Sequence, residues 1–284
     1  MQIMISDDIR AYLLPRAFNA AVRAGWEIMN VYNNSDDYNI EVKSDKTPLT
    51  IADRLAHNKI KEVLGETRIP ILSEEGREML YDERRNWEMF WLVDPLDGTI
   101  EFIKGNNEFT VNIALMADRE AICSVVYVPY LKRAYIAGSQ IGAYVLTDID
   151  PSADAEYTYE QICKRRQQLP LSSMQHTAYR IAVSRSHQTP ETQQYIDAKR
   201  ELHTDVEVIE QGSSYKFCML AEGSIDYYPR TTHTYEWDTA AAELILSEAG
   251  GTTHSIDEHE PLKYNKEDLR NPYFECYGAT AVRD

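Results

Sequence analysis

The most informative stretch of this 284-residue sequence is Trp91-Leu92-Val93-Asp94-Pro95-Leu96-Asp97-Gly98-Thr99. The apolar run over residues 90–93 is typical of a short buried strand, after which Pro95 and Gly98 turn the chain. Two carboxylates therefore leave the end of a strand together and face a cleft at the edge of a sheet. Because close carboxylates repel each other, a hard divalent cation with oxygen ligands is their usual companion. From this stretch alone, an Asp-Pro turn with a solvated second aspartate is an equally good interpretation.

Composition indicates a globular protein with one large or two modest domains. Apolar residues make up 43% of the chain, and we find neither a leader sequence nor a run of membrane-spanning length. The four cysteines are scattered without a CxxC pair, so neither zinc nor disulfides are expected. A cytoplasmic location is predicted, with peripheral association at the inner face of the membrane left open. The net charge of −17 disfavours nucleic acid polymers, although bound cations would allow a small anionic substrate.

The pattern of apolar residues predicts two unlike halves. Residues 1–150 form an N-terminal α+β metal-binding subdomain, in which helices over residues 6–33 and from Thr50 onward lie on a largely antiparallel sheet. Residues 151–284 form a C-terminal α/β substrate-recognition subdomain of alternating strands and helices. Residues 148–177 are polar and predict a connection between the two. The predicted fold class is therefore mixed α+β and α/β, with the active site between two subdomains.

Further acidic residues stand at the ends of predicted elements. Glu74 and Glu75 follow a predicted strand, and Asp238 begins the last long helix. Each has a plainer interpretation, because a charged loop explains the glutamates and helix capping explains Asp238. Asp53 could likewise serve only in a capping box with Thr50.

The combination of these acids favours a shared site over four separate structural roles. Glu74, Asp94, Asp97 and Asp238 supply about the right number of ligands for two or three Mg²⁺ ions that keep some waters. A site with several metal ions suits in-line phosphoryl chemistry, since one ion activates water and another stabilises the leaving oxygen.

Four ordered motifs resemble those of the inositol monophosphatase superfamily, whose members are lithium-sensitive, Mg²⁺-dependent phosphatases. They are Pro48-Leu49-Thr50-x-x-Asp53, Leu72-Ser73-Glu74-Glu75, Asp94-Pro95-Leu96-Asp97-Gly98-Thr99, and Trp237-Asp238-Thr239-Ala240-Ala241 followed by Glu248-Ala249-Gly250-Gly251. The resemblance covers nearly the whole chain. It implies the layered αβαβα sugar-phosphatase fold, with the active site between the two subdomains.

Within that superfamily the sequence is most similar to the CysQ-type 3'(2'),5'-bisphosphate nucleotidases. The stretches that carry this similarity are residues 94–105, 108–114, 184–187, 212–218, 221–223 and 228–230. The similarity implies a cytoplasmic hydrolase of sulfur metabolism. It would convert 3'(2')-phosphoadenosine 5'-phosphate to AMP and phosphate with water activated by Mg²⁺.

The resemblance also implies which residues hold the metal ions. Glu74, Asp94 and the Leu96 carbonyl would bind one Mg²⁺. Asp94, Asp97 and Asp238 would bind a second.

Catalytic roles follow from the same resemblance. Thr99 and Asp53 would orient the attacking water, and Glu75 would assist from outside the ligand shell. The backbone amides of Gly98 and Thr99 would cradle the scissile phosphate.

A second set of residues would recognise the rest of the nucleotide. Ser213, Lys216 and Arg230 would bind the remote 5'-phosphate, with His187 as a weaker candidate, and Asp238 would also contact the substrate. Without the resemblance, a helix cap, a solvated lysine and a surface ion pair would explain the first three.

Two departures from the family pattern stand out. Ile100 replaces the lysine that usually follows the Asp-Gly-Thr motif, and residues 148–170 look longer than in compact relatives. Glu236 adds an acid without an assigned role.

Two other functions stay open from the sequence. One is an inositol monophosphatase or another small sugar-phosphate phosphatase, although an inositol monophosphate offers Lys216 and Arg230 no second phosphate. The other is a non-catalytic nucleotide- or metal-binding protein, against which the water-orienting pair Thr99 and Asp53 argues. The protein is expected to be a monomer or homodimer.

Overall fold

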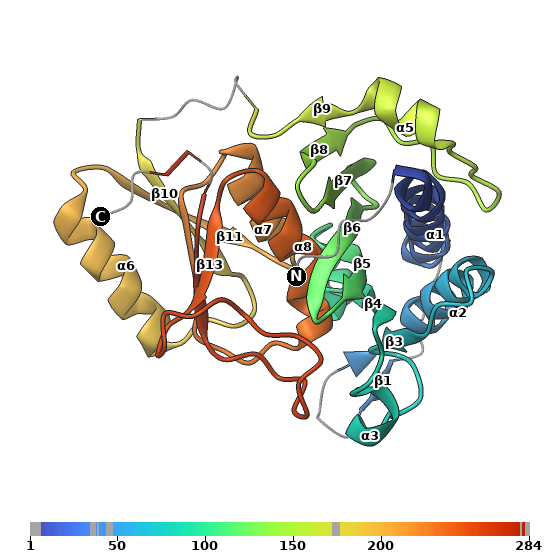
Figure 1. The fold of residues 1–284 in the computed structure, drawn as a ribbon. Helices are drawn as coiled ribbons and strands as arrows, with labels where there is room; N and C mark the ends of the chain where they lie inside the picture. Colours follow the sequence, from blue (N-terminus) through green and yellow to red (C-terminus); the bar gives the residue numbers. More distant parts are fainter. Residues whose placement is uncertain are drawn as a thin grey trace.

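The computed structural model describes residues 7–34, 38, 40–43, 48–171, 177–278, 280 and 281. Residue 6 of the predicted first helix and residues 172–176 of the predicted connection lie outside these residues. Five layers follow one another across the molecule (Figure 1): a helical pair, a sheet, a second helical pair, a second sheet and an outer helix. This is the mixed, layered fold that the sequence predicts.

The first helical layer consists of α1 (Asp7–Asn34) and α2 (Ile51–Gly65). Their apolar faces bury Phe18 and Ile60 against sheet residues such as Trp91. α1 continues through Pro15. α2 begins at Thr50, whose side chain caps the helix.

The first sheet has the strand order β3-β4-β5-β6-β7-β8-β9. Only β3 and β4 run parallel; all the other neighbours are antiparallel. The strands span Ile71–Ser73, Met89–Asp97, Thr110–Ala117, Glu120–Val128, Arg133–Gly138, Gly142–Leu146 and Gln167–Gln168.

The first sheet extends beyond residue 150. β9 pairs with β8, and the preceding α5 (Tyr159–Arg165) lies beside α1 (Figure 1). The chain therefore leaves the first sheet after Gln168, and the division into subdomains at residue 150 stays a prediction. Apolar periodicity missed this extension because β9 is short and exposed.

The second half of the chain forms the remaining layers. α7 (Tyr215–Glu222) and α8 (Glu236–Glu248) lie in the middle, with a buried apolar cluster shared between them and both sheets. The second sheet has the order β11-β10-β12-β14-β13, and α6 (Pro190–Leu202) packs on its outer side. In chain order its strands are Tyr179–Ser184, Val206–Gln211, Tyr227–Arg230, Thr252–Ser255 and Phe274–Tyr277.

Short elements complete the edge near the predicted site. β1 (Glu41–Val42) pairs with β2 (Pro48–Leu49), α3 (Tyr81–Arg84) follows β3, and α4 (Thr99–Lys104) follows β4. In the part of the chain that the structure describes, no helix combines the length and apolarity needed to cross a membrane.

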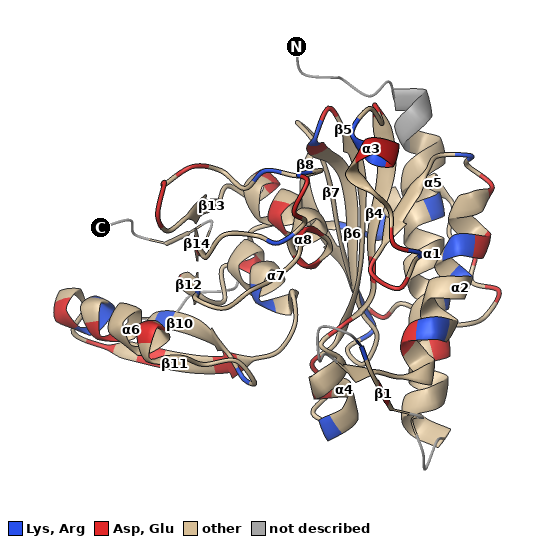
Figure 2. Cartoon of the chain, turned by 90° about the horizontal axis from the view of Figure 1, so that it is seen from below, with Lys and Arg blue, Asp and Glu red and all other residues tan. Residues whose placement is uncertain are grey.

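Charged side chains of both signs are spread over the molecule. In Figure 2, acidic and basic segments alternate on α6 at one end and along α1 and α2 at the other. The net charge of −17 is thus distributed over several elements and does not by itself point to a binding face.

Candidate active site

The two parallel strands of the first sheet bring acidic residues to one edge. β3 and β4 end side by side, and the Glu74 amide donates to the Val93 carbonyl at 3.1 Å. The pairing of β4 with β5 shifts register between Asp94 and Asp97. This irregularity is the bend that the proline in the motif predicts, and it separates the two carboxylates along the strand.

A turn after β4 starts a short helix at this edge. Gly98 has φ +91°, a left-handed conformation that glycine adopts without strain, and α4 begins at Thr99. The turn places both residues at the wall of a cavity of about 180 Å³. Since a single water needs only about 10–15 Å³, this cavity has room for a small molecule.

Every residue predicted to bind metal or substrate lines this cavity. The metal-site group consists of Glu74, Asp94, Leu96, Asp97 and Asp238. The substrate group also includes Gly98, Thr99, His187, Ser213, Lys216 and Arg230. Five separate stretches of chain therefore converge on one cavity, although their roles stay predictions.

Burial and mutual repulsion disfavour ionisation of the four carboxylates. The pKa values of Asp94 and Asp238 are raised well above the usual range, first by burial and then by neighbouring carboxylates. Burial also raises the pKa values of Asp97 and Glu74. A hard cation would offset both effects, so the donor set fits Mg²⁺.

Protein donors hold these carboxylates in the structure. The Lys43 ammonium contacts Glu74 at 2.7 Å, and the Leu96 amide donates to Asp94 at 3.0 Å. The Ser214 amide donates to Asp97 at 2.5 Å. As they stand, no three histidine, cysteine or acidic side chains of the described residues are grouped closely enough to hold a metal ion.

Lys43 connects both glutamates of the Ser-Glu-Glu-Gly loop. Its ammonium forms ion pairs with Glu74 and Glu75. Burial alone would lower the pKa of Lys43, but these ion pairs raise it. Burial and the charge of Glu74 raise the pKa of Glu75 to about 7. Glu75 is not among the cavity-lining residues, and its supporting role outside the ligand shell stays a prediction.

Asp53 makes the capping contact expected of it and also contacts Thr99, while its catalytic role stays a prediction. Its Oδ2 accepts hydrogen bonds from the Thr50 amide at 2.7 Å and the Thr50 hydroxyl at 2.6 Å, which completes a capping box. Its Oδ1 accepts a hydrogen bond from the Thr99 hydroxyl at 3.2 Å. The capping interaction therefore orients the carboxylate that contacts Thr99.

The cavity wall also holds a buried lysine. Lys216 is only 2% exposed, and its ammonium donates to the carbonyls of Ser213 at 2.6 Å and Gln211 at 3.0 Å. Burial and the charge of Arg230 lower the pKa of Lys216 to about 7. Lys216 is therefore not the solvated surface lysine of the plainer interpretation.

The Arg230 guanidinium, which also lines the cavity, keeps a free hydrogen-bond donor. Its Nη2 donates to the His233 carbonyl at 3.3 Å, while its buried Nε has no hydrogen-bond partner among the described residues. His187 also faces the cavity, and burial together with the Arg230 charge lowers the pKa of its imidazole.

Sequence reasoning missed several residues at the site. Lys43 lies in a polar segment without periodicity, and Ser214 and Tyr228 line the cavity between residues that were assigned. Glu101 was quoted only as part of a family motif, yet it also lines the cavity. The residue types gave little signal, because a lysine or a glutamate near an acidic motif is most often a solvated surface group.

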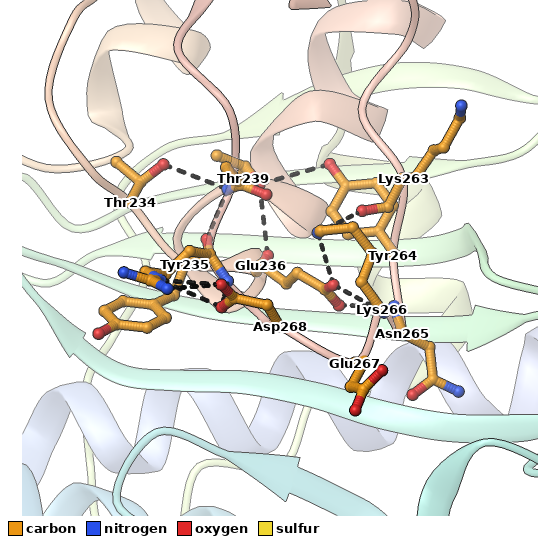
Figure 3. A network of polar contacts seen from close by, with 12 residues as sticks. Thr234, Tyr235, Glu236, Thr239, Lys263, Tyr264, Asn265, Lys266, Glu267 and Asp268 are labelled. Atoms are coloured by element: carbon orange, nitrogen blue, oxygen red, sulfur yellow. Dashed lines mark hydrogen bonds and ion pairs between the residues drawn. The ribbon is translucent and has the colours of Figure 1, made fainter. Parts of the chain in front are cut away.

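Glu236, unassigned from the sequence, anchors the helix that carries Asp238. Its buried carboxylate accepts hydrogen bonds from the Asn265 amide at 2.6 Å and the Lys266 ammonium at 2.6 Å (Figure 3). Arg84 in α3 donates to the Asn265 side chain at 2.7 Å. This network ties the start of α8 to the segment that follows the Glu74 loop.

Replacing Glu236 by alanine (Glu236→Ala) is expected to lower the free energy of unfolding by about 2–4 kcal/mol, because it removes one partner of a buried charge pair. Urea denaturation of both proteins measures the difference. The matched control is Glu62→Ala, which removes the exposed ion pair with Lys59 on α2. A loss no larger than that of the control would show that the network does not anchor α8.

The layers and the converging acidic motifs define a member of a known class. The chain belongs to the inositol monophosphatase family, whose model matches residues 10–276. This confirms the resemblance carried by the four motifs.

Individual relatives are similar over nearly the full chain. CysQ from Bacteroides thetaiotaomicron, described as a bacterial member of the inositol monophosphatase family, is 43% identical. The match to its crystal structure covers 98% of this chain and 99% of that chain, with a TM-score of 0.86. The 3'(2'),5'-bisphosphate nucleotidase CysQ of Escherichia coli strain K12 is 36% identical over 265 residues, which are 92% of this chain and 98% of that protein. Inositol monophosphatase from Anabaena, at 20% identity, covers 96% of this chain and 92% of its own with a TM-score of 0.67, and shares the fold.

Proposed function

We propose that this protein is a Mg²⁺-dependent phosphatase that hydrolyses 3'(2')-phosphoadenosine 5'-phosphate to AMP and phosphate. The observation that carries the proposal is one cavity lined by groups of both charges. Its wall holds four carboxylates together with Lys216 and Arg230. The names of the relatives at 36% and 43% identity support the same activity.

The four carboxylates of the cavity wall form the proposed metal site. Glu74, Asp94 and the Leu96 carbonyl would hold one Mg²⁺, and Asp94, Asp97 and Asp238 a second. Bound Mg²⁺ supplies an acidified water and stabilises charge on the leaving oxygen. Lys43, which neutralises Glu74 in the structure, would share that carboxylate or withdraw from it.

Thr99 and Asp53 are the proposed groups that position the attacking water. The Thr99 hydroxyl can donate to Asp53 at 3.2 Å or to the Leu96 carbonyl at 3.3 Å, and in either case a lone pair of its oxygen is free to accept a hydrogen bond from water in the cavity. The proton lost by the water can then move through the hydroxyl to the carboxylate. Burial raises the pKa of Asp53, which makes it a better proton acceptor.

The substrate would lie in the cavity, in contact with both the carboxylates and the basic residues. The amides of Gly98 and Thr99 are proposed to cradle the scissile phosphate beside the carboxylates. Ser213, Lys216 and Arg230 are proposed to bind the remote 5'-phosphate, and His187 and Asp238 to contact the nucleotide between them. A dianionic phosphate beside Lys216 would favour the protonated amine.

The two halves of the chain divide these tasks in our proposal. The first half supplies most of the proposed metal ligands and the second half supplies the recognition residues, with Asp238 on α8 joining the two. The four cysteines are free thiols, which suits a cytoplasmic location.

Phosphate release in Mg²⁺ buffer tests the proposed substrate. We expect kcat/KM for 3'-phosphoadenosine 5'-phosphate to exceed that for inositol 1-phosphate and fructose 1,6-bisphosphate by at least about tenfold, or about 1.4 kcal/mol. A preference for either sugar phosphate would contradict the nucleotide assignment and favour the sugar-phosphatase alternative.

Replacing Lys216 by alanine (Lys216→Ala) is expected to raise KM for the bisphosphate by about 10- to 100-fold, because a buried charge-assisted contact to the 5'-phosphate is lost. KM for 3'-AMP, which has no 5'-phosphate, should change much less. Initial rates with both substrates measure the effect. Equal increases in KM for both substrates would show that Lys216 does not bind the 5'-phosphate.

The pH dependence provides a control for this prediction. Lys216 has a pKa of about 7 in the free protein, so its positive charge is present below pH 7 and lost above it. KM for the bisphosphate should therefore rise above pH 7 in the wild type, and this rise should be absent in Lys216→Ala. KM for 3'-AMP should show no corresponding rise in either protein.

A further inference from the structure

Glu101 is a buried carboxylate at the cavity wall without a hydrogen-bond donor of its own. It belongs to α4, is 4% exposed and lines the cavity. Among the described residues, no hydrogen bond to its carboxylate oxygens is found, and neither oxygen is among the fully buried unpartnered atoms, so both stay accessible from the cavity. Its accepting capacity is therefore available to a molecule in the cavity.

Two glycines leave the space that Glu101 fills. A Cβ atom added at Gly98 would lie 3.4 Å from Oε2 of Glu101. A Cβ atom added at Gly212 would lie 2.4 Å from its Cγ and 3.0 Å from its Cδ. The carboxylate is thus enclosed by backbone on two sides, unlike the freely moving end of a surface glutamate.

Two basic side chains of the cavity wall, Lys216 and His187, interact electrostatically with the Glu101 carboxylate. An ionised carboxylate accepts hydrogen bonds and repels phosphate. The group that fits against Glu101 is therefore a donor on the substrate, such as a hydroxyl.

The position of Glu101 indicates which hydroxyl this would be. Its Oε2 lies next to Gly98, whose amide is proposed to cradle the scissile phosphate. If the scissile phosphate lies there, the nearest donor of the substrate is a hydroxyl on the sugar carbon adjacent to the phosphorylated one. Both the 3'- and the 2'-phosphate isomers of the nucleotide carry a hydroxyl on that adjacent carbon.

We propose that Glu101 is a specificity-determining residue that accepts a hydrogen bond from the free ribose hydroxyl next to the scissile phosphate. This inference rests on the proposed nucleotidase function and adds a requirement for a vicinal hydroxyl. It predicts that a 2'-deoxynucleotide is a poor substrate.

A neighbouring carboxylate serves as the matched control. Glu108 accepts hydrogen bonds from Arg185 Nε and Nη2, each at 2.8 Å, and from the Gly212 amide at 2.8 Å. It contacts the same glycine as Glu101, but its acceptors are used by the protein and it is not among the cavity-lining residues. Glu108→Gln therefore changes the local charge without removing a carboxylate from the cavity.

The test compares 3'-phosphoadenosine 5'-phosphate with 2'-deoxyadenosine 3',5'-bisphosphate, which lacks only the adjacent hydroxyl. We expect the wild type to prefer the ribonucleotide in kcat/KM by at least about tenfold, as for a hydrogen bond to a charged acceptor. In Glu101→Ala the ratio should fall to about one, through loss of activity on the ribonucleotide. Glu101→Gln, which keeps a carbonyl acceptor of the same size, should retain part of the preference, and Glu108→Gln all of it.

The outcomes separate failure of this inference from failure of the proposed function. Turnover of both nucleotides with the same ratio in the wild type and Glu101→Ala would overturn the role of Glu101. Equal kcat/KM values of the wild type for the two nucleotides would overturn it as well. Absence of nucleotide turnover in the wild type would instead overturn the proposed function on which it rests. If Glu101→Ala does not fold, as judged by circular dichroism, an unchanged ratio in Glu101→Gln would count against the inference.

Discussion

Replacing Asp97 by asparagine (Asp97→Asn) is expected to lower kcat by about three orders of magnitude, or about 4 kcal/mol in the activation free energy. Asp97 is the last residue of β4 and is one of the four carboxylates that line the cavity. In the proposed function it holds Mg²⁺ together with Asp94 and Asp238. An amide is a much weaker ligand for a hard cation than a carboxylate, so the metal-activated water and the stabilised leaving oxygen would be lost together.

The fold is expected to survive this substitution. The Oδ2 atom of Asp97 accepts a hydrogen bond from the Ser214 amide at 2.5 Å, and an asparagine carbonyl oxygen can accept the same bond. The substitution also removes one of several repelling buried charges, which offsets part of any loss in stability. Thermal unfolding should therefore remain cooperative, with a Tm close to that of the wild type.

A surface aspartate provides the control for the change in net charge. Asp82→Asn removes the same charge from a side chain that is 81% exposed and distant in the chain from the acidic strand ends. Its kcat should match that of the wild type. Raising the Mg²⁺ concentration should restore part of the activity of Asp97→Asn and have no such effect on the control. A kcat for Asp97→Asn within about tenfold of the wild type would contradict a metal-binding role for Asp97.

The elements that position the site were predictable because local signals determine them. The apolar run before Asp94 predicted β4, and the Thr50 cap predicted the start of α2. Backbone polar groups lack partners at helix starts, and the loops at element ends carry many functional residues. Acids in these places were therefore good candidates for one site. The family match confirms the fold, while the roles of the individual acids stay predictions.

The features that the sequence did not reveal depend on contacts between distant segments. Lys43 contacts Glu74 across 31 residues, and Arg84 contacts Asn265 across 181 residues. Periodicity reports which face of an element is buried, but not which other segment covers it. Glu101 was overlooked for the same reason, since only the folded chain places Gly212 against it and turns its carboxylate to the cavity.

Replacing Asp53 by asparagine (Asp53→Asn) is expected to lower kcat by about 100- to 1,000-fold, because the proton acceptor behind Thr99 is lost. Asp53 does not line the cavity and acts through the Thr99 hydroxyl, which donates to it at 3.2 Å. With an amide in its place, the hydroxyl can still donate to a carbonyl oxygen, but no carboxylate remains behind it to take the proton from the water. The Mg²⁺ concentration that gives half-maximal activity should change little, since the four proposed metal ligands are intact.

The capping role of Asp53 must be separated from its catalytic role, since the substitution also weakens the capping box of α2. Gln161→Ala removes the equivalent residue from the capping box of α5, which lies outside the cavity-lining elements. A lost cap costs about 1 kcal/mol of stability, so both variants should show a similar decrease in the free energy of unfolding. Only Asp53→Asn should lose turnover. If both variants kept their activity, Asp53 would be a helix cap alone, and Thr99 would need another residue to take the proton.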